Sequence, residues 1–512
     1  MILLAADASL AAELGGIYRI RLGLIQAVIV TDPYIISEIL APGAEVEKSI
    51  DLVYSHFDVL NHASGKPTIF TSPSDDHWRL VRKAVAPAFN PKNIRHGFQF
   101  VQQTVSQLID ILKLRGPDEV IDMDNAALRV TLDVIGQVGF GKDFGATKSL
   151  DARDTANAAF ATMEAGRDEG VKRWNNPLRR FCTFLPDVRK GKTDFARFRA
   201  VMTSLLSEIK ARGETQSDDV SIAAHLLRMR DAKGQPLPDD RLAAEIGVFF
   251  TGGFETTGHT IGWALYMISQ HPEVEAKVVA ELDDMGLLAT CDRPDPRPME
   301  HADLQELKYT LQAIKESMRL LPVLTGGTNR TTAKPTRIGP VTVPAGTMVW
   351  IPFSALFNSP HNWEAPDVYD PDRWRAPDVE YAVAKGTNAN GHVMSSLSTD
   401  LGKTSHVLHL EARAGGVAGG AVKASAPDQG RTKRWMPFSM GSRDCIGQNL
   451  ARMNYMTAVA MLLSHFHFEL APEMGGKAGV RAAESAALLT LQPRHGMKML
   501  CMPRQSIRSA HR

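Results

Sequence analysis

The chain has 512 residues, a formal net charge of +1, 44% hydrophobic residues and 22% charged residues. This length and hydrophobic content support one large, helix-rich domain over residues 1–512. The near-zero charge gives no support for nucleic acid as a partner. Four cysteines, at 182, 291, 445 and 501, are widely scattered, which argues against a disulfide framework or a zinc site.

The N-terminal residues do not have the pattern of a membrane anchor. A membrane-spanning helix needs about 20 consecutive apolar residues, and the opening apolar run is interrupted by Asp7 and Glu13. The run also lacks the basic start and the cleavage site of a signal peptide. The sequence therefore predicts neither an anchor nor a signal peptide in this stretch.

Two short strands open the predicted structure. Residues 17–22 alternate apolar and polar side chains, and the apolar run 27–30 follows after a short break, a pattern typical of a hairpin. A helix is expected over residues 32–40. Residues 51–76 contain scattered prolines and paired aspartates, so we expect an irregular loop there.

The next helix carries an aromatic and a basic residue on one face. Trp78 and Arg82 are four residues apart, which places them one helical turn apart. An ordinary surface helix with a half-buried tryptophan would show the same pattern. Amphipathic helices follow over residues 98–114 and 126–139, and helical patterns continue over 150–231 without an assignable function.

A long central helix is predicted over residues 238–270, about 45 Å if it is fully helical. Gly252 and Gly253 lie inside it, and each costs about 1 kcal/mol relative to alanine, which indicates a close approach or a local opening. Glu255 and Thr256 lie in an apolar context, where an unpaired carboxylate is expensive. A helix crossing at the glycines, with the glutamate capped locally, is the alternative explanation.

A further helix, ending near Leu321, carries Glu316 and Arg319 three residues apart on one face. Residues 303–306 fit a capping box that introduces this helix. Taken alone, the charged pair fits an exposed salt bridge that contributes little to stability. Residues 341–350 then predict a hairpin with a Pro/Gly turn.

The connection over residues 375–432 is long and contains a Gly/Ala-rich stretch at 415–420. Because this composition buries little apolar surface, we expect a low-complexity, disordered surface insertion. Arg431, Lys433 and Arg434 follow near its end. These charges fit either a docking patch for an acidic redox protein or a simple solvated run.

The decapeptide 438–447, FSMGSRDCIG, combines several features around one sulfur. Gly441 and Gly447 supply backbone freedom on either side of Cys445. An apolar pattern at helical spacing follows, so the cysteine should lie just ahead of a helix N-terminus, which favours a thiolate able to bind soft iron. Arg443 adds a positive charge suited to a carboxylate partner. A structural cysteine in a Gly-containing turn is the alternative.

The decapeptide resembles the haem-binding signature of the cytochrome P450 superfamily, Phe-x-x-Gly-x-Arg-x-Cys-x-Gly, at every fixed position. Residues 252–257 also fit the family motif Ala/Gly-Gly-x-Asp/Glu-Thr-Thr/Ser, and the chain has Trp-x-x-x-Arg, Glu-x-x-Arg and Pro-x-Arg-Trp elements in the same order as the family. The resemblance covers about residues 17–502 apart from the insertion. It implies a mainly α fold with small β-sheets, the cytochrome P450 fold.

The resemblance also implies roles for individual residues. Cys445 would be the axial ligand of haem b, and a thiolate ligand favours O–O cleavage. Thr256 would be the hydroxyl that faces dioxygen, and Glu255 the acid that feeds a proton relay. The other haem-binding positions implied by the match are Trp78, Arg82, Arg330, Phe438, Arg443 and Gly447.

A buried charged cluster is implied as well. In the family, the Glu-x-x-Arg pair is joined by a later arginine, so Glu316 and Arg319 would pair with Arg373. Removing one member of such a cluster should cost several kcal/mol, on the order of 3–5. We interpret these three residues as structural.

The activity implied by the resemblance is monooxygenation, in which one atom of O₂ enters a hydrophobic organic substrate and the other leaves as water. The sequence has no dinucleotide or flavin fingerprint, so the electrons would come from an NADPH-dependent flavoprotein reductase or a ferredoxin. A monomer is expected. Two alternatives stay open: a haem-thiolate isomerase or dehydratase, which typically lacks the acid and threonine pair, and a non-catalytic haem sensor.

The resemblance is compatible with more than one location in the cell. Eukaryotic members of the family usually carry an N-terminal anchor before the first strand. This chain would therefore be either a soluble intracellular member or one whose missing leader associates it with the endoplasmic reticulum or a plastid membrane.

Overall fold

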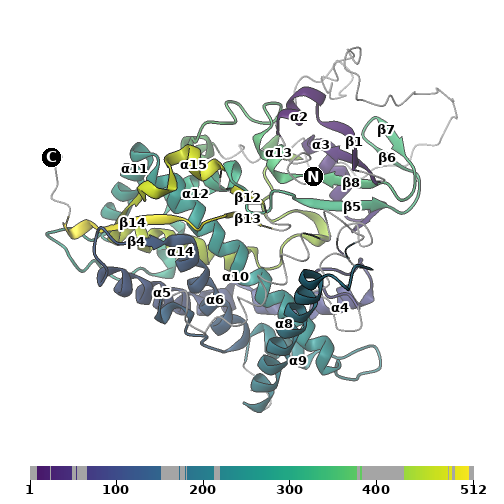
Figure 1. The fold of residues 1–512 in the computed structure, drawn as a ribbon, viewed down its shortest axis with the longest axis horizontal. Coiled ribbons are helices and arrows are strands. Elements are labelled where there is room, and N and C mark those ends of the chain that lie inside the picture. The colour runs from purple at the N-terminus through teal and green to yellow at the C-terminus, as the bar shows by residue number, and fades with distance from the viewer. Residues whose placement is uncertain are drawn as a thin grey trace.

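The structure is a computed structural model in which α-helices predominate and the β-sheets are small (Figure 1). This arrangement confirms the predicted mainly α fold with small β-sheets. The residues that the structure describes are 8–22, 25–48, 54, 66–150, 172, 179, 181–212, 219–376, 381–382, 432–482, 484–486 and 490–506.

The elements have the following bounds. The described α-helices are α2 (Ala8–Leu14), α3 (Pro33–Leu40), α4 (Asp76–Val85), α5 (Pro91–Lys113), α6 (Met123–Phe140), α8 (Pro186–Ala211), α9 (Ile222–Arg228), α10 (Asp239–Ser269), α11 (Pro272–Asp284), α12 (Lys308–Leu320), α13 (Phe353–Asn358), α14 (Gln448–His465) and α15 (Gly476–Ala482). The described strands are β1 (Ile17–Leu22), β2 (Ile25–Val30), β3 (Val46–Lys48), β4 (Val120–Asp122), β5 (Thr328–Thr332), β6 (Thr336–Ile338), β7 (Val341–Val343), β8 (Met348–Ile351), β9 (Tyr381–Ala382), β10 (Thr432–Lys433), β11 (Phe466–Leu470), β12 (Glu484–Ala486), β13 (Leu491–Pro493) and β14 (Lys498–Pro503).

The largest sheet has the strand order β1-β2-β8-β5-β3. Its first two strands pair antiparallel, with Ile17 opposite Val30, so the predicted N-terminal hairpin is confirmed. The predicted hairpin over residues 341–350 is wrong, because β7 pairs with β6 and β8 pairs with β2 and β5. All four residues of β8 are buried, and a central position in the large sheet buries them on both faces.

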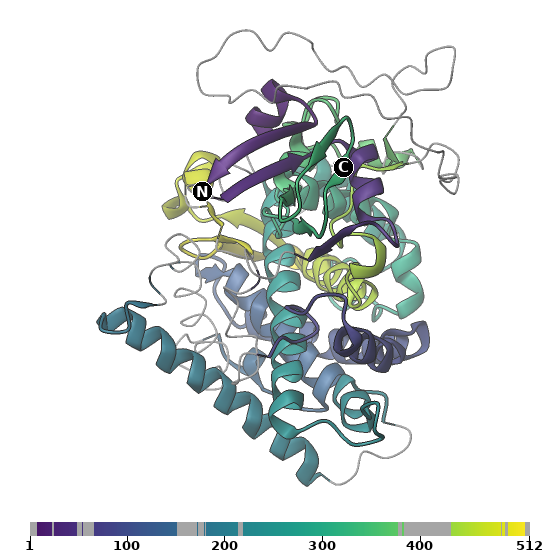
Figure 2. The same cartoon turned by 90° about the vertical axis from the view of Figure 1, so that its right-hand side faces the viewer.

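Helix α10 runs through the middle of the molecule, as the teal helix at the centre of Figure 2 shows. It occupies nearly all of the predicted range and packs mainly against α6. A Cβ atom on Gly253 would overlap the side chain of Ile135 in α6, whereas one on Gly252 would meet nothing within 4 Å. The two adjacent glycines therefore serve different purposes: Gly253 permits the helix crossing and Gly252 borders open space.

Several helices begin where polar side chains can cap them. Helix α5 starts earlier than predicted because Asn90 accepts a hydrogen bond from the Asn93 amide at 2.8 Å, as N-cap residues do. The predicted capping box at residues 303–306 is wrong. Asp303 instead closes a box with Glu300 on a short 3₁₀ turn, His301–Gln305.

The N-terminus of α12 is capped by a residue of another helix. The Glu281 carboxylate of α11 accepts hydrogen bonds from the amides of Tyr309 and Thr310 at 2.7 and 2.9 Å. These amides are among the donors that a helix start leaves without an intrahelical partner. A local sequence pattern could not reveal this cap, because the capping residue is about 28 positions away.

Most of the predicted insertion at 375–432 lies outside the described residues, as does most of the loop predicted at 51–76. The short strands at the two ends of the insertion, β9 and β10, pair antiparallel, with Tyr381 opposite Lys433. The chain therefore leaves and re-enters the described structure at neighbouring positions.

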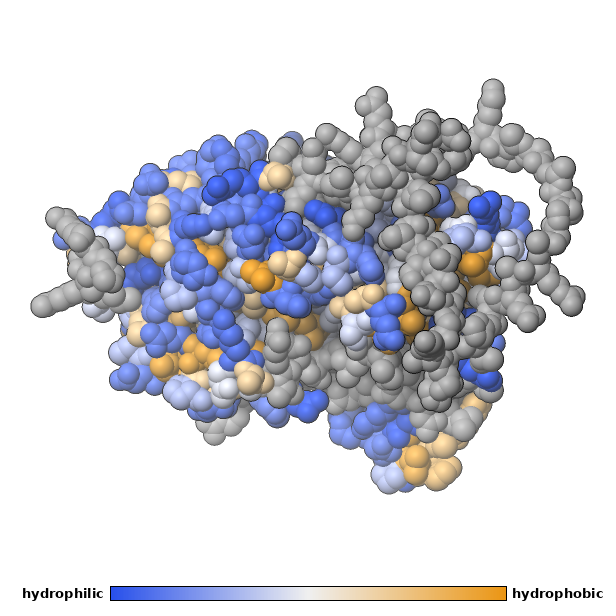
Figure 3. All heavy atoms as spheres, turned by 90° about the horizontal axis from the view of Figure 1, so that it is seen from above, coloured by the Kyte–Doolittle hydropathy of each residue, from blue (hydrophilic) through white to orange (hydrophobic). Residues whose placement is uncertain are grey.

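The face of the molecule seen in Figure 3 is largely hydrophilic where residues are coloured, with hydrophobic side chains in small separate groups. None of the helices in the described part of the chain combines the length and the hydrophobicity that a membrane crossing requires.

Candidate active site

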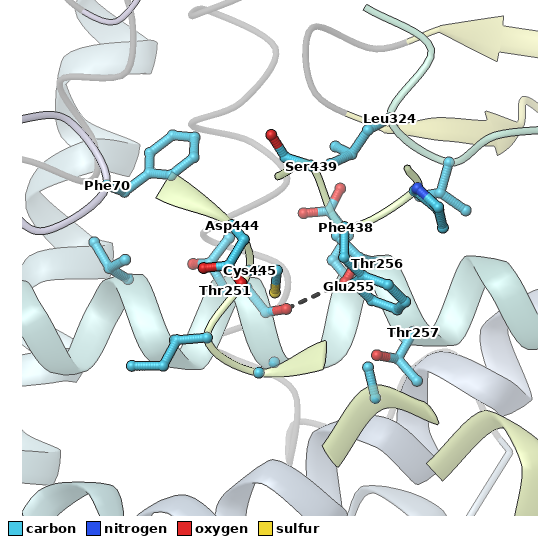
Figure 4. Close-up of a pocket in the computed structure, with 18 of the residues that line it drawn as sticks. Phe70, Thr251, Glu255, Thr256, Thr257, Leu324, Phe438, Ser439, Asp444 and Cys445 are labelled. Carbon is cyan, nitrogen blue, oxygen red and sulfur yellow. Dashed lines mark hydrogen bonds between the residues drawn. The ribbon is translucent and has the colours of Figure 1, made fainter. Parts of the chain in front are cut away.

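A cavity of about 370 Å³ lies between α10, α4 and the loop that precedes α14. Figure 4 shows Cys445 and Asp444 of this loop beside Thr251, Glu255 and Thr256 of α10. The structure brings together on the cavity wall every residue predicted to be catalytic or haem-binding: Trp78, Arg82, Glu255, Thr256, Arg330, Phe438, Arg443, Cys445 and Gly447.

The loop around Cys445 is shaped by its backbone. Gly441 has φ of +78°, and a Cβ there would overlap the carbonyl oxygen of Leu40, so glycine is required on both counts. The Cys445 amide donates to the Phe438 carbonyl at 2.9 Å, which closes the loop. Gly447 has φ of −87°, so the predicted need for backbone freedom at this position is wrong. Its missing side chain instead leaves space beside the sulfur on the cavity wall.

The Cys445 side chain exposes its surface to the cavity, just ahead of α14. Burial raises the pKa of the Cys445 thiol, and the charge of Asp444 raises it further. The Gly447 amide and the Arg82 guanidinium oppose this shift but do not reverse it. The protein groups alone therefore favour the thiol, contrary to our expectation from the helix N-terminus. A bound metal ion would hold the sulfur as a thiolate.

Three cationic side chains line the cavity near one another: Lys48, Arg330 and Arg443. None of them forms an ion pair with a carboxylate among the residues that the structure describes. Burial lowers the pKa of each group, and neighbouring positive charges lower those of Lys48 and Arg443 further, the latter to about 10. The charge of Glu47 opposes the shifts of Arg330 and Arg443 but does not reverse them. The protein therefore does not supply enough negative charge to neutralise the cluster.

Neutral groups hold these cations in place. Lys48 Nζ donates to the Phe70 carbonyl and lies 3.9 Å from the centroid of the Tyr54 ring. Arg330 Nη1 donates to Thr328 Oγ1 at 2.6 Å. Arg443 donates to a backbone carbonyl, and its Nε is buried without a hydrogen-bond partner. Sequence reasoning missed Lys48, because it belongs to no motif.

The predicted Trp78 and Arg82 pair lies beside this cluster. The Arg443 guanidinium carbon is 4.3 Å from the centroid of the Trp78 ring, a cation–π distance. Arg82 forms an ion pair with the Asp444 carboxylate, and its Nη1 donates to the Asp444 carbonyl at 2.9 Å. Arg82 thus joins α4 to the Cys445 loop, and its charge is already neutralised.

These features fit haem b. The part of the chain that the structure describes has no group of three or more His, Cys, Asp or Glu side chains that could hold a metal ion. A single cysteine can hold iron only if other ligands complete the coordination sphere, as a porphyrin does. Two carboxylates on the same molecule would supply negative charge to Lys48, Arg330 and the unpartnered Arg443 Nε.

The α10 side of the cavity holds the predicted acid and hydroxyl. Glu255 is 3% exposed, and its Oε1 accepts a hydrogen bond from Thr490 Oγ1 at 2.7 Å. Thr256 Oγ1 donates to the Gly252 carbonyl of its own helix at 3.2 Å. Sequence reasoning missed Thr490, because it belongs to no motif and lies 235 residues from Glu255.

The predicted charged cluster lies outside the cavity wall. Arg319 meets the Glu316 carboxylate with two nitrogens, at 2.9 and 3.0 Å, and both side chains are fully buried. Arg373 Nε lies 3.4 Å from Glu316 Oε1. Trp374 Nε1 donates to Glu316 Oε2 at 2.9 Å, a contact that sequence reasoning missed. The cluster joins α12 to the turn at Pro371–Arg375.

The chain is similar to several known proteins. It is 26% identical over 529 residues to cytochrome P450 97B2, chloroplastic, from Glycine max, covering 97% of this chain and 82% of the relative. It is 24% identical to the protein LUTEIN DEFICIENT 5, chloroplastic, from Arabidopsis thaliana, covering 95% and 71%. It is 27% identical to the cyclooctat-9-en-7-ol 5-monooxygenase of Streptomyces melanosporofaciens, covering 72% and 74%.

A family model also matches most of the sequence. It is described as Cytochrome P450 and aligns with residues 2–391 and 422–497. The chain therefore belongs to the cytochrome P450 family and is a monooxygenase that binds haem b.

Proposed function

We propose that the protein inserts one atom of O₂ into a hydrophobic organic substrate, with Cys445 as the iron ligand. The observation that carries the proposal is that one cavity holds a single cysteine sulfur, cations without an acidic partner, and the Glu255 and Thr256 pair. When bound, haem b supplies the activation of O₂. Trp78, Arg330 and Arg443, together with Lys48, would hold its carboxylates, while Phe438 and Gly447 would border it.

Glu255 and Thr256 would deliver protons on the α10 side of the cavity. Gly252 leaves the helix surface open beside them, so a small molecule can reach the Thr256 hydroxyl. The buried Glu255 carboxyl can take a proton and pass it on through that hydroxyl. A haem-thiolate isomerase or dehydratase needs no such pair, so its presence favours oxygenation.

The substrate class follows from the cavity wall. Much of the cavity wall is aromatic or aliphatic, and such a surface favours apolar ligands. The apolar residues that line the cavity include Ile69, Phe70, Phe89, Val134, Ile135, Ile222, Val248, Phe249, Val323 and Leu324.

The electrons would come from outside the chain, through an NADPH-dependent flavoprotein reductase or a ferredoxin. Lys433 is exposed and precedes the Cys445 loop, which is compatible with an acidic redox partner. The Arg434 side chain is less available to such a partner, because it donates a hydrogen bond to the Asn362 carbonyl. We propose a monomer. The relatives from Glycine max and Arabidopsis thaliana are named chloroplastic, which favours the plastid among the locations considered above.

The carbon monoxide difference spectrum of the dithionite-reduced protein tests the iron ligand. A strongly red-shifted Soret band is expected for the wild type and for Cys291→Ala, whose cysteine is exposed outside the cavity. Cys445→Ala should lose that band. A preserved band in Cys445→Ala would contradict the assignment of Cys445 as the iron ligand. Absence of haem from the wild type would refute the proposed function.

A second measurement separates an oxygenase from a haem sensor. With an apolar substrate found by its shift of the Soret band, NADPH and a redox partner should yield a product that carries one atom from ¹⁸O₂. Thr256→Ala should consume NADPH with less product per electron pair. Unchanged coupling in Thr256→Ala would argue against its proton role, and absence of turnover with every redox partner would favour the sensor.

A further inference from the structure

Thr490 contacts the proposed proton donor from a distant part of the chain. It is 1% exposed and lies next to β13, and its Oγ1 donates to Glu255 Oε1 at 2.7 Å across 235 residues of sequence. Both residues line the cavity. The hydrogen bond thus reaches the Glu255 carboxylate from outside α10.

The backbone directly after Thr490 is held by two hydrogen bonds. The amide of the next residue, Leu491, donates to the Val323 carbonyl at 2.7 Å. The Leu491 carbonyl accepts from Trp263 Nε1 at 3.1 Å, and Trp263 lies two turns after Glu255 on α10. The helix that carries the acid therefore also holds the residue next to the threonine, so the hydroxyl is preorganised toward the carboxylate.

A hydroxyl in this position has two chemical effects. It keeps one carboxylate oxygen in a fixed place, which restricts the side-chain conformations of Glu255. It also satisfies one hydrogen-bond acceptor of a side chain that is only 3% exposed. Loss of the hydroxyl would leave a buried oxygen without this partner, which is costly in an apolar cavity.

We propose that Thr490 is a positioning residue for proton delivery by Glu255. This inference rests on the proposed function, in which Glu255 supplies the protons that O₂ reduction consumes. Reduction to water takes four electrons and four protons for each O₂, whereas reduction to hydrogen peroxide takes two of each. A carboxyl group that is poorly placed should therefore increase the share of peroxide.

The test uses the haem-loaded protein without an organic substrate, supplied with NADPH, a plant-type ferredoxin and its reductase in excess. The readouts are the rate of O₂ consumption, the hydrogen peroxide released per O₂, and the carbon monoxide difference spectrum of each variant. Thr490→Val removes the hydroxyl at constant shape, and Thr490→Ser restores it. Thr310→Val is the matched control, because Thr310 Oγ1 donates to the Glu281 carboxylate at 2.7 Å away from the cavity.

We expect Thr490→Val to consume O₂ several-fold more slowly and to release more peroxide per O₂, while it keeps the carbon monoxide spectrum of the wild type. Thr490→Ser and Thr310→Val should behave as the wild type. Wild-type behaviour of Thr490→Val overturns the inference, and so does a Thr490→Ser variant as defective as the valine variant. If Thr490→Val loses haem, Thr490→Ala is measured against the same criteria. The carbon monoxide spectrum keeps the tests separate: a wild type without the red-shifted band contradicts the proposed function itself.

Discussion

Two groups of buried charges in this protein differ in whether their charge is neutralised. The Glu316 carboxylate is met by Arg319 at 2.9 and 3.0 Å, and further donors complete its surroundings. The cavity cations Lys48, Arg330 and Arg443 have no carboxylate partner among the described residues, and nearby positive charges lower the pKa values of Lys48 and Arg443. One group is complete within the protein, and the other needs an anion.

The difference separates structural charges from binding charges. Taking a charge out of water is expensive, and good pairing is required to recover the cost. In the Glu316 cluster, pairing within the fold offsets the desolvation energy, so removal of a member should lower the stability of the fold. In the cavity cluster, only a bound anion can offset the desolvation energy. Removal of one of these cations should therefore weaken cofactor binding and leave the fold intact. The sequence pattern identified the members of both groups except Lys48, and the contacts show which group is neutralised within the protein.

Replacing Glu316 should have the largest effect on stability. Glu316→Gln leaves the fully buried Arg319 without its counter-charge, which should cost about 3–5 kcal/mol of unfolding free energy. Urea unfolding of the haem-loaded protein measures the change. Glu306→Gln is the control, because Glu306 forms an exposed ion pair in which its Oε2 lies 3.5 Å from Lys308 Nζ. A loss below about 1 kcal/mol in Glu316→Gln would place this pair with ordinary surface ion pairs.

Replacing Lys48 should instead affect cofactor retention. Lys48→Met removes one cation and relieves repulsion with Arg443 and Arg330, so the unfolding free energy of the protein should not fall. Loss of one charge-assisted hydrogen bond, about 1.4 kcal/mol, corresponds to about tenfold faster haem release. Transfer of haem to excess apomyoglobin measures this rate. Lys83→Met, an exposed change on α4, should match the wild type. Unchanged release in Lys48→Met would remove Lys48 from the binding cluster.

Removing Arg373 should cost less than removing Glu316. Its Nε lies 3.4 Å from Glu316 Oε1, and the carboxylate keeps its two shorter bonds to Arg319. We therefore expect Arg373→Met to lose about 1 kcal/mol of unfolding free energy. The same urea experiment applies. A loss as large as that of Glu316→Gln would mean that Arg373 neutralises the carboxylate as much as Arg319 does.

The sequence predicted the cavity wall better than the contacts within it. Residues in fixed motifs, such as Glu255 and Cys445, were assigned to the site by their resemblance to the motifs of the family. Thr490 and Lys48 were missed because each meets its partner across a long stretch of chain and belongs to no local pattern. Trp374 belongs to a motif, but the motif does not reveal its hydrogen bond to Glu316. A motif constrains one element at a time, whereas packing decides which elements meet.

The errors in the fold have the same physical cause. The strands at 341–343 and 348–351 are separated by a Pro/Gly turn, yet they pair with other strands because the second is buried at the centre of a sheet. Helix α12 is capped by Glu281 of a neighbouring helix and not by its own sequence. The long central helix was predicted well, because its period repeats over many turns.

A third charged group, near the C-terminus, should be complete only within a pH window. His467 Nδ1 lies 2.7 Å from Glu275 Oε1, and Arg504 also pairs with this carboxylate. The hydrogen bond to Glu275 raises the pKa of His467 above 6.5. Although burial opposes the shift, the hydrogen bond from His467 and the charge of Arg504 lower the pKa of Glu275 below 4.5.

The stabilisation by the histidine is therefore full below pH 6.5 and is lost as the pH rises through the folded-state pKa of His467. The stabilisation by the carboxylate is present above pH 4.5 and is lost as the pH falls.

Comparison of the wild type with His467→Gln should reveal this window. Because His467 is partly exposed, solvent screening limits the expected difference in unfolding free energy to about 0.5–1 kcal/mol at pH 5.5. The difference should shrink at pH 8, where the imidazole is neutral. Urea unfolding of both proteins at the two pH values measures it. A difference that does not change with pH would mean that His467 acts through packing, and the Glu275 cluster would then be complete with Arg504 alone.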